Sequence, residues 1–350
     1  MSEYILITGG AGFIGTNVAR AYLERGQRVQ LFDNLSRAEV EQNARELAAE
    51  FPGRVQLVGS DVRQKRELER AVEGASAVFH FAAQVAVTTS LEDPVRDAET
   101  NLIGTLNLLE ALRRRGEDVP LLFTSTNKVY GCLAGVPLRK REARYEPEDE
   151  ALAREGVSEK QALEFLSPYG CSKGSADQYV LDYARSYGIC ATVFRMSCIY
   201  GPYQRGSEDQ GWVAHFLRRT LKGEPVTIFG DGKQVRDLLY VGDLVEAMRV
   251  AVENIESCAG EAFNIGGGAG HSASLLEVLR EIQGLTGLHP EIRFSEARLG
   301  DQRWYVSNNS KAARVFGWRA RTSVRQGLKN LMEWYSGRPE LIGQSALQVV

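Results

Sequence analysis

The feature that most restricts the fold of this chain is the alternation of short apolar runs with amphipathic helical runs. The apolar runs YILIT, RVQLF, RVQLV, AVFHF and PLLFTS are each followed by a segment with helical periodicity, and ATVFRM comes later. Near-continuous apolar strands separated by helices indicate a parallel sheet covered by helices on both faces. We therefore expect an α/β fold with a doubly wound parallel sheet, in which ligands bind outside the carboxyl ends of the strands.

The alternation weakens after about residue 195, which suggests a second region. Residues 1–195 are predicted to form the doubly wound, Rossmann-type domain, to which residues 236–265 return. Residues 196–235 and 266–350 are predicted to form a smaller α/β region packed against the carboxyl edge of the sheet. Residues 131–167 form a long polar insertion rich in Arg and Glu, and insertions of this length are typical of functional lids or flexible excursions.

Composition excludes several classes of protein. The 350 residues carry 42 Lys and Arg against 45 Asp and Glu, a net charge of −3, without a long basic run, which argues against nucleic-acid binding. No apolar stretch approaches the roughly 18 residues of a membrane span, and no secretory signal is recognisable. Five cysteines without a CxxC pair favour reduced thiols and a cytoplasmic location. Four scattered histidines give no reason to expect a metal site.

The sequence ITGGAGFIG places Gly9, Gly12 and Gly15 between the first strand and the first helix. Glycines in this position permit a tight turn and close approach of the backbone to a pyrophosphate. The helix that follows presents free N–H groups to the same phosphates. The motif in this context predicts a dinucleotide site.

Two acidic residues follow later strands of the same domain. Asp33, at the end of the second strand, can accept hydrogen bonds from both adenosine ribose hydroxyls and would repel a 2′-phosphate, which favours NAD over NADP. Arg37 nearby is a cation that would tolerate such a phosphate, and Asp33 has an alternative role as a cap or turn residue. Asp61 can meet the adenine edge or cap the next helix.

The sequence SPYGCSK begins a predicted helix and places Tyr169 and Lys173 one turn apart on the same face. One interpretation is a phenol packed over a lysine stem. Beside a dinucleotide, a second interpretation is a catalytic base. Free tyrosine has a pKa near 10, and a lysine ammonium together with a cationic nicotinamide would favour the phenolate. Thr124, Ser125 and Thr126 end the fifth strand and offer hydroxyl groups to a substrate oxygen.

These motifs, together with HFAA, Asn101 and GDGKQVRD, make the chain similar to the extended short-chain dehydrogenase/reductase family of nucleotide-sugar enzymes over nearly its whole length. The resemblance implies a catalytic triad of Thr126, Tyr169 and Lys173. It also implies tightly bound NAD, with NAD+ as the resting form, because an enzyme that lost NADH during a cycle could not return the hydride to the sugar. The implied cofactor contacts are Gly9, Gly12, Phe13, Ile14, Asp33, Asn34, Ser36, Arg37, Asp61, Val62, Phe81, Ala82, Ala83, Asn101, Thr124, Tyr169 and Lys173. A homodimer through a four-helix bundle, formed by residues 94–114 and 174–187, is implied as well.

Dehydratases of this family carry an Asp-Glu pair directly after the catalytic threonine, which supplies the acid and base for elimination of water. This chain has Asn127 and Lys128 there. Because an amide cannot shuttle a proton in this way, dehydration is disfavoured, and redox-neutral epimerisation through a keto intermediate is favoured.

Four sequence segments resemble those of one group within the family, the CDP-paratose (CDP-tyvelose) 2-epimerases. They are AAQVAVTTS, TSTNKVYG, SPYGCSKGSADQYVLDYAR and DQGWV. The resemblance implies oxidation at C2 of a CDP-linked hexose. A UDP- or CDP-sugar 4-epimerase with the same triad is the alternative. A binding-only dinucleotide scaffold is a third possibility, although such a module has no use for a poised base.

The expected substrate contacts come from both regions of the chain. They are Gln84, Thr88, Thr89, Thr126, Asn127, Ser197, Trp212, Val213, Arg236, Arg298 and Asp301. Arginine forks suit phosphate oxygens, so Arg236 and Arg298 are expected to clamp the pyrophosphate. The alternatives are turn and cap roles for the small polar residues, structural salt bridges for the arginines, and core packing for Trp212.

Overall fold

A seven-stranded parallel sheet forms the centre of the protein. The computed structural model describes residues 3–37, 40–207, 210–298 and 300–342. The strands are β1 (Tyr4–Thr8), β2 (Val29–Asp33), β3 (Val55–Gly59), β4 (Ala75–His80), β5 (Leu121–Thr126), β8 (Ala191–Met196) and β12 (Ala262–Ile265). Their order across the sheet is β3-β2-β1-β4-β5-β8-β12, and all paired neighbours are parallel. The predicted doubly wound fold class is confirmed.

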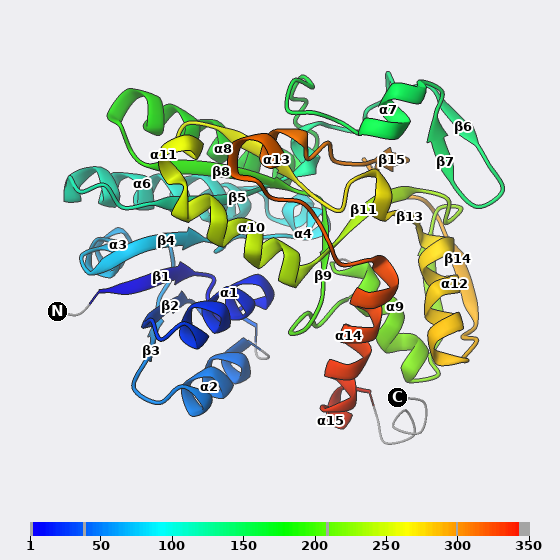
Figure 1. The fold of residues 1–350 in the computed structure, drawn as a ribbon, viewed down its shortest axis with the longest axis horizontal. Helices are drawn as coiled ribbons and strands as arrows, with labels where there is room; N and C mark the ends of the chain where they lie inside the picture. Colours follow the sequence, from blue (N-terminus) through cyan, green and yellow to red (C-terminus); the bar gives the residue numbers. More distant parts are fainter. Residues whose placement is uncertain (1–2, 38–39, 208–209, 299, 343–350) are drawn as a thin grey trace.

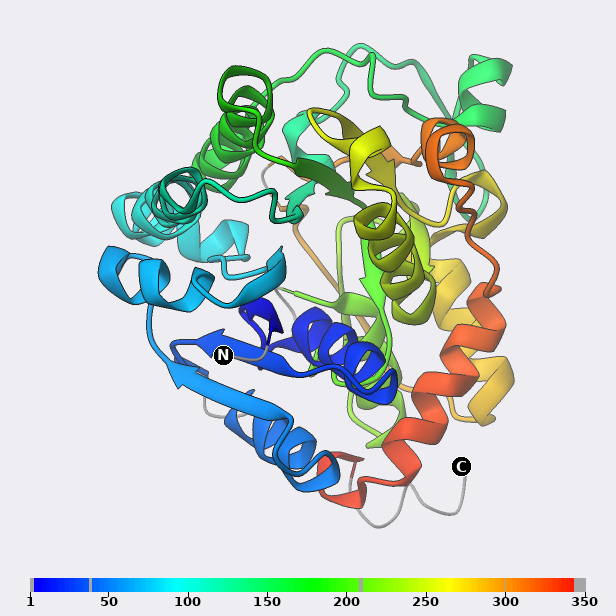
Figure 2. The ribbon, with the colours of Figure 1, turned by 60° about the vertical axis from the view of Figure 1, so that its left-hand side comes forward.

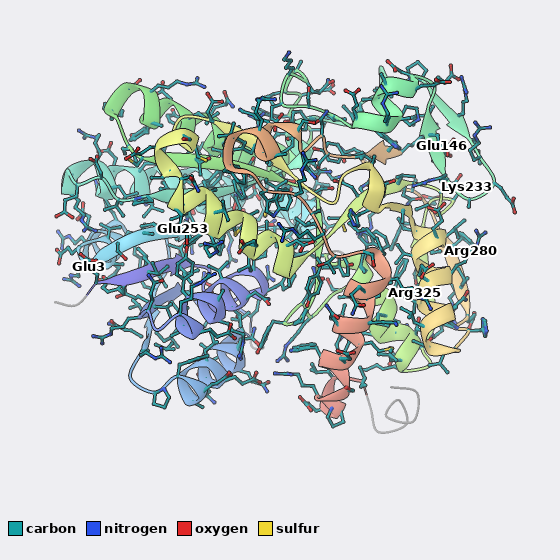
Figure 3. All side chains as sticks on the ribbon, in the orientation of Figure 1. Glu3, Glu146, Lys233, Glu253, Arg280 and Arg325 are labelled. Carbon is teal, nitrogen blue, oxygen red and sulfur yellow. The ribbon has the colours of Figure 1, made fainter. Side chains whose placement is uncertain are left out.

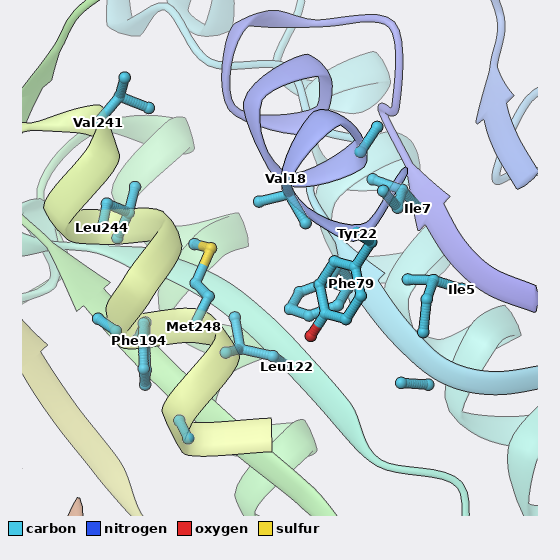
Figure 4. Packing of buried hydrophobic residues seen from close by; sticks show 14 of the residues in the cluster. Ile5, Ile7, Val18, Tyr22, Phe79, Leu122, Phe194, Val241, Leu244 and Met248 are labelled. Atoms are coloured by element: carbon cyan, nitrogen blue, oxygen red, sulfur yellow. The ribbon is translucent and has the colours of Figure 1, made fainter. Parts of the chain in front are cut away.

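Helices cover both faces of this sheet (Figures 1 and 2). One face carries α1 (Phe13–Glu24), α2 (Val40–Glu50), α10 (Val241–Glu253), α11 (Ile255–Cys258) and α13 (Ser310–Phe316). The other carries α3 (Lys65–Val72), α6 (Gly104–Arg115) and α8 (Ser167–Tyr187). Alternate strand residues serve the two layers, since Ile5 and Ile7 lie in the first core and Leu6 lies in the second. Figure 4 shows Ile5 and Ile7 near Val18 of α1, with Met248 of α10 in the same core.

Between β4 and β5 the chain forms several short helical segments before α6. They are α4 (Val87–Glu92), α5 (Pro94–Ala98) and the π-helical turn η1 (Glu99–Ile103). A 3-10 turn, η2 (Asn127–Val129), follows β5 directly. These segments lie at the carboxyl edge of the sheet, where the sequence predicts ligand binding.

The C-terminal region has its own small sheets and its own core. One sheet joins β9 (Cys198–Tyr200), β11 (Val235–Tyr240), β13 (Ser272–Ser274) and β15 (Trp304–Tyr305), and a second pairs β10 (Val226–Phe229) with β14 (Ile292–Ser295). Around them are α9 (Trp212–Leu221), η3 (Ala269–His271), α12 (Leu275–Thr286), α14 (Val324–Ser336) and α15 (Pro339–Ile342). Of residues 236–265, α10 and β12 lie with the large sheet, whereas β11 lies in the small one.

The insertion at residues 131–167 packs against this region. It contains a hairpin of β6 (Leu138–Lys140) and β7 (Tyr145–Pro147), followed by α7 (Glu150–Glu155). The N–H of Val157 donates to the carbonyl of Val306 at 2.7 Å, and Leu133 and Val157 share a core with Trp304. The insertion therefore does not extend freely into solvent, which was one of the two expectations for it, because its few apolar residues pack against β11 and β15.

Charged side chains surround the ribbon on its outer faces, as Figure 3 shows for Glu3, Glu253, Arg280 and Arg325. No described helix is both long and apolar enough to cross a membrane. All five cysteines are free thiols. Asp209, which belongs to the DQGWV segment, and residues 343–350 of the predicted smaller α/β region lie outside the described residues.

Candidate active site

The glycine turn between β1 and α1 packs too closely against the neighbouring backbone to admit side chains. Gly9 has φ +66°, and a Cβ atom there would lie 2.7 Å from the amide nitrogen of Ala82. Gly12 precedes the first turn of α1, which contains no acidic residue. Phe13 and Ile14 follow it and are partly exposed. A tight glycine turn that leads into a helix N-terminus without an acidic side chain fits a pyrophosphate group.

Asp33 is fixed against this turn. Its Oδ2 atom accepts a hydrogen bond from the N–H of Ala11 at 3.1 Å, and Oδ1 accepts one from the N–H of Leu35 at 2.9 Å. Burial raises the pKa of Asp33, and the two N–H groups and Arg37 oppose this rise. Asn34, Ser36 and Arg37 are exposed beside it. The carboxylate thus has a defined position at the end of β2, next to the glycines.

Asp61 borders an open groove of about 430 Å³ together with Glu99 and Ile103. Burial alone would raise the pKa of Asp61, but hydrogen bonds from Arg63 and Asn34 outweigh it and bring the pKa to about 2. Asp61 is therefore ionised at neutral pH. The side chain of Val62 lies in the core, so only its backbone can contact a cofactor.

The turn after β4 closes over the glycines. Phe81, Ala82 and Ala83 are all partly exposed there, and the N–H of Phe81 donates to the carbonyl of Thr8 at 3.0 Å. Thr124 is buried in β5, and its hydroxyl donates to the carbonyl of His80 at 3.2 Å. These residues form the wall of the site between β1 and β5.

Thr126, at the carboxyl end of β5, has its hydroxyl near enough to the phenol of Tyr169 to lower the pKa of that phenol. The backbone N–H of Tyr169 donates to the hydroxyl of Ser90 at 3.2 Å, which fixes the start of α8. Lys173, one turn later, is only 4% exposed, and its ammonium lies 4.2 Å from the centroid of the Phe123 ring. The fold thus brings together a threonine and a tyrosine that are 43 positions apart in the sequence.

Burial is the largest influence on the ionisation of Tyr169 and Lys173. Burial raises the pKa of Tyr169 to about 12, with the Thr126 hydrogen bond opposing and the Asp97 charge adding to the rise. Burial lowers the pKa of Lys173 to about 7, against the charges of Asp177 and Asp97. Both groups are thus desolvated in the protein without a cofactor. The expected shift toward the phenolate requires the cationic nicotinamide as well as the lysine, and it stays a prediction.

The sequence analysis did not predict a network of buried hydrogen bonds next to Tyr169. Ser172 donates to Oδ2 of Asp97, and the Asn101 amide donates to Oδ1 of Asp97 at 3.1 Å and to the Ser172 hydroxyl at 3.0 Å. Asn101 also accepts from the N–H of Gln84 at 2.8 Å. Asn101 is 1% exposed and positions the Gln84 loop, and its contact with the cofactor stays a prediction. The spacing of Asp97 and Asn101, four apart in a helical segment, was the available signal.

The end of β5 is joined to the segment at 300–302. Asn127 donates to Oε1 of Gln302 at 3.0 Å, and Gln302 donates to the carbonyl of Gly131 at 2.7 Å. Arg236 donates to Oδ1 of Asp301 at 2.6 Å, and the Lys128 ammonium lies 3.4 Å from the same oxygen. The sequence did not indicate Gln302 or Lys128 as residues of the site, because the residues that they contact are far away in the sequence.

Four expected substrate residues of the C-terminal region differ in what their side chains contact. The Arg298 guanidinium lies 3.9 Å from the centroid of the Phe229 ring, and Trp212 packs edge-on against Phe216 at 5.4 Å. Ser197 donates its hydroxyl to the carboxylate of Asp237. Val213 is fully buried in the C-terminal core, so its side chain packs and does not face a substrate.

Three expected contacts follow β4. The side chain of Gln84 closes a turn with the backbone of Ala86, through bonds of 2.8 and 2.5 Å. Thr88 is partly exposed on α4, and Thr89 is exposed next to it. All three residues keep some exposed surface, and Thr89 is the most exposed of them.

The model of the NAD dependent epimerase/dehydratase family matches residues 5–266. The chain belongs to this family. CDP-paratose 2-epimerase of Salmonella typhi is 39% identical to it over 339 residues, which cover 95% of this chain and 99% of that protein. Family membership confirms the resemblance that the sequence motifs indicated.

Solved structures of other family members have the same fold. UDP-glucose 4-epimerase from Thermotoga maritima with UDP-glucose has a TM-score of 0.80 and 33% identity, and the match covers 95% of this chain and 99% of that one. UDP-glucose 4-epimerase of Thermus thermophilus in complex with NAD has a TM-score of 0.78 and 33% identity, with 96% and 99% covered. Among the residues that the structure describes, no group of His, Cys, Asp and Glu could hold a metal ion.

Proposed function

We propose that this family member catalyses redox-neutral epimerisation at C2 of a CDP-linked hexose, with Thr126, Tyr169 and Lys173 as its catalytic residues. The observation that carries the proposal is that the fold places the Thr126 hydroxyl beside the Tyr169 phenol at the carboxyl end of β5, two strands from β1 and its glycine turn. A hydroxyl and a phenol side by side can hold one substrate oxygen between them.

Each catalytic residue has a distinct role in the proposed reaction. Thr126 orients the hydroxyl of the reacting carbon, and Tyr169 accepts its proton as the carbon is oxidised to the ketone. When bound, NAD supplies the hydride acceptor, later the hydride donor, and a positive ring that favours the phenolate. Tyr169 then returns the proton to the ketone oxygen when the hydride reaches the opposite face. Lys173 adds positive charge beside the phenolate whenever it is protonated.

The residues after Thr126 favour epimerisation over dehydration. Neither Asn127 nor Lys128 has a carboxyl group that could serve as the acid or base for elimination of water. Instead, Asn127 bonds to Gln302, and Lys128 pairs with Asp301. Similarity to CDP-paratose 2-epimerase supports C2 as the reacting carbon and CDP as the carrier. The alternative is a UDP- or CDP-sugar 4-epimerase with the same triad, which similarity to UDP-glucose 4-epimerases favours.

The proposal includes the cofactor state, the domain roles and the assembly. NAD would stay bound between turnovers as NAD+, and residues 196–235 and 266–350 would bind the nucleotide sugar. A homodimer is proposed through the helices at 94–114 and 174–187. The exposed apolar side chains of Val95, Ile103, Tyr179 and Tyr187, at 67%, 46%, 43% and 55%, support such an interface. We propose a cytoplasmic location from the free thiols.

Incubation with CDP-, UDP-, GDP- and dTDP-hexoses, followed by NMR of the products, tests the function. We expect inversion at C2 of a CDP-hexose and no net reduction of NAD. Inversion at C4 alone would select the 4-epimerase alternative. Release of water from the sugar would contradict both candidates.

A further inference from the structure

We propose that the ammonium group of Lys128 binds the phosphate attached to the hexose and thereby brings C2, rather than C4, to the catalytic threonine. This inference rests on the proposed function and adds a specificity-determining residue to it. It concerns a lysine that the sequence motifs used only as an argument against dehydration.

The first argument is the position of Lys128. It lies in η2, and its backbone N–H donates to the hydroxyl of Thr126 at 3.2 Å. Its ammonium reaches the other way, to 3.5 Å from the carbonyl of Gly300 and 3.4 Å from Oδ1 of Asp301. Lys128 therefore links the catalytic end of β5 to the residues expected to clamp the pyrophosphate.

The second argument is the charge around Asp301. The single carboxylate of Asp301 is shared by two cations, Lys128 and Arg236, on the same oxygen atom. Burial alone would raise the pKa of Asp301, but the two cations outweigh it and lower the pKa. Burial and the charge of Arg236 lower the pKa of Lys128, against Asp301 and Cys132. With Lys128 protonated, the cluster of Lys128, Arg236 and Asp301 carries one surplus positive charge, so an anion that approaches the two cations beside Asp301 would be stabilised by both.

The third argument is the chemistry of a hexosyl diphosphate. Only C1 and the glycosidic oxygen separate C2 from the nearest phosphorus atom, whereas C4 lies across the ring from it. Lys128 follows Thr126 by two residues, so we expect its ammonium to reach this phosphate when the carbon next to C1 lies at Thr126. With C4 at Thr126, the phosphate would lie about a ring width farther from Thr126.

Binding measurements on the NAD-loaded enzyme test the assignment. CDP carries the second phosphate and CMP lacks it, so their dissociation constants isolate its recognition. For Lys128→Met we expect CDP to bind at least about tenfold more weakly and CMP to bind as before, as for a lost charge-assisted hydrogen bond. Lys128→Arg should restore most of the CDP affinity. The matched control is Lys140→Met, which removes an exposed lysine of β6 that pairs with Asp231 and should change neither constant.

The outcomes separate this inference from the proposed function. Equal losses for CDP and CMP, or no loss for either, in a Lys128→Met protein that still melts like the wild type would overturn the role of Lys128. A C4-inverted product with an intact CDP–CMP contrast would overturn the C2 assignment while leaving the phosphate contact. Failure of the wild type to bind CDP at all would overturn both.

Discussion

Arg195 and Asp177 form a two-bond ion pair in which both N···O distances are 2.9 Å. The side chains are 6% and 0% exposed, so the pair is buried on the inner side of α8. Asp177 lies one helical turn after Lys173, and its charge raises the pKa of that lysine against the effect of burial. A single carboxylate therefore neutralises a structural arginine and favours the charged form of the lysine that we propose to be catalytic.

Replacement of Asp177 by Asn should destabilise the fold strongly, because it leaves the Arg195 guanidinium buried without its counter-charge. We expect a loss of roughly 3–5 kcal/mol in the free energy of unfolding, measured by denaturant titration. Asp182→Asn, at an exposed position of the same helix, is the control and should change stability little. Equal stabilities of the two variants would show that the ion pair contributes nothing.

Replacement of Tyr169 by Phe removes the proposed base and keeps the ring. We expect turnover to fall by about 10²–10⁴-fold, the usual contribution of a positioned acid–base group. NAD binding and the melting temperature should stay close to those of the wild type. Tyr179→Phe, an exposed ring on the same helix, should keep full activity. Unchanged sugar conversion in Tyr169→Phe would remove this residue from the mechanism.

Lys173 should make stability depend on pH in a definite direction. Its pKa is about 7 in the folded protein, against an ordinary value of 10.5. Between these values the unfolded chain binds more protons, so folding becomes more favourable as pH rises, and the full cost of burying the lysine is present below about 7. Relative to Lys173→Met, the wild type should gain stability across this interval. A difference that does not vary with pH would show that the lysine keeps its ordinary pKa when buried.

Replacement of Asp33 by Ser should reduce the preference for NAD over NADP. Part of any loss will affect both cofactors equally, since Asp33 also holds the Ala11 N–H in the glycine turn. The ratio of the two dissociation constants is therefore the informative quantity, and we expect it to shift by about tenfold toward NADP. Asp118→Ser, at an exposed position, should leave the ratio unchanged. An unaltered ratio in Asp33→Ser would mean that this carboxylate does not select the cofactor.

The sequence was sufficient for the fold because its signals are local. Each predicted apolar run overlaps a strand of the large sheet, and Tyr169 and Lys173 lie four residues apart in the single helix α8. The behaviour of the insertion at 131–167 was harder to foresee. Its packing depends on contacts such as Val157 with Val306, which are distant in the sequence and have no periodicity.

The parts of the site that escaped prediction depend on tertiary burial. Nothing local indicates that Asp97 contacts Ser172, or that Gln302 meets Asn127 across 175 positions. The pKa shifts were missed for the same reason. The sequence shows that a lysine lies beside Tyr169, but it does not show how much water both groups lose.

The most direct test of the account is the fate of deuterium placed at C2 of a CDP-hexose substrate. Hydride removal and return within one active site predicts a product that is inverted at C2 and retains the deuterium there, even in ordinary water. Loss of the label to solvent, or inversion at C4 with C2 untouched, would contradict epimerisation by internal hydride return at C2.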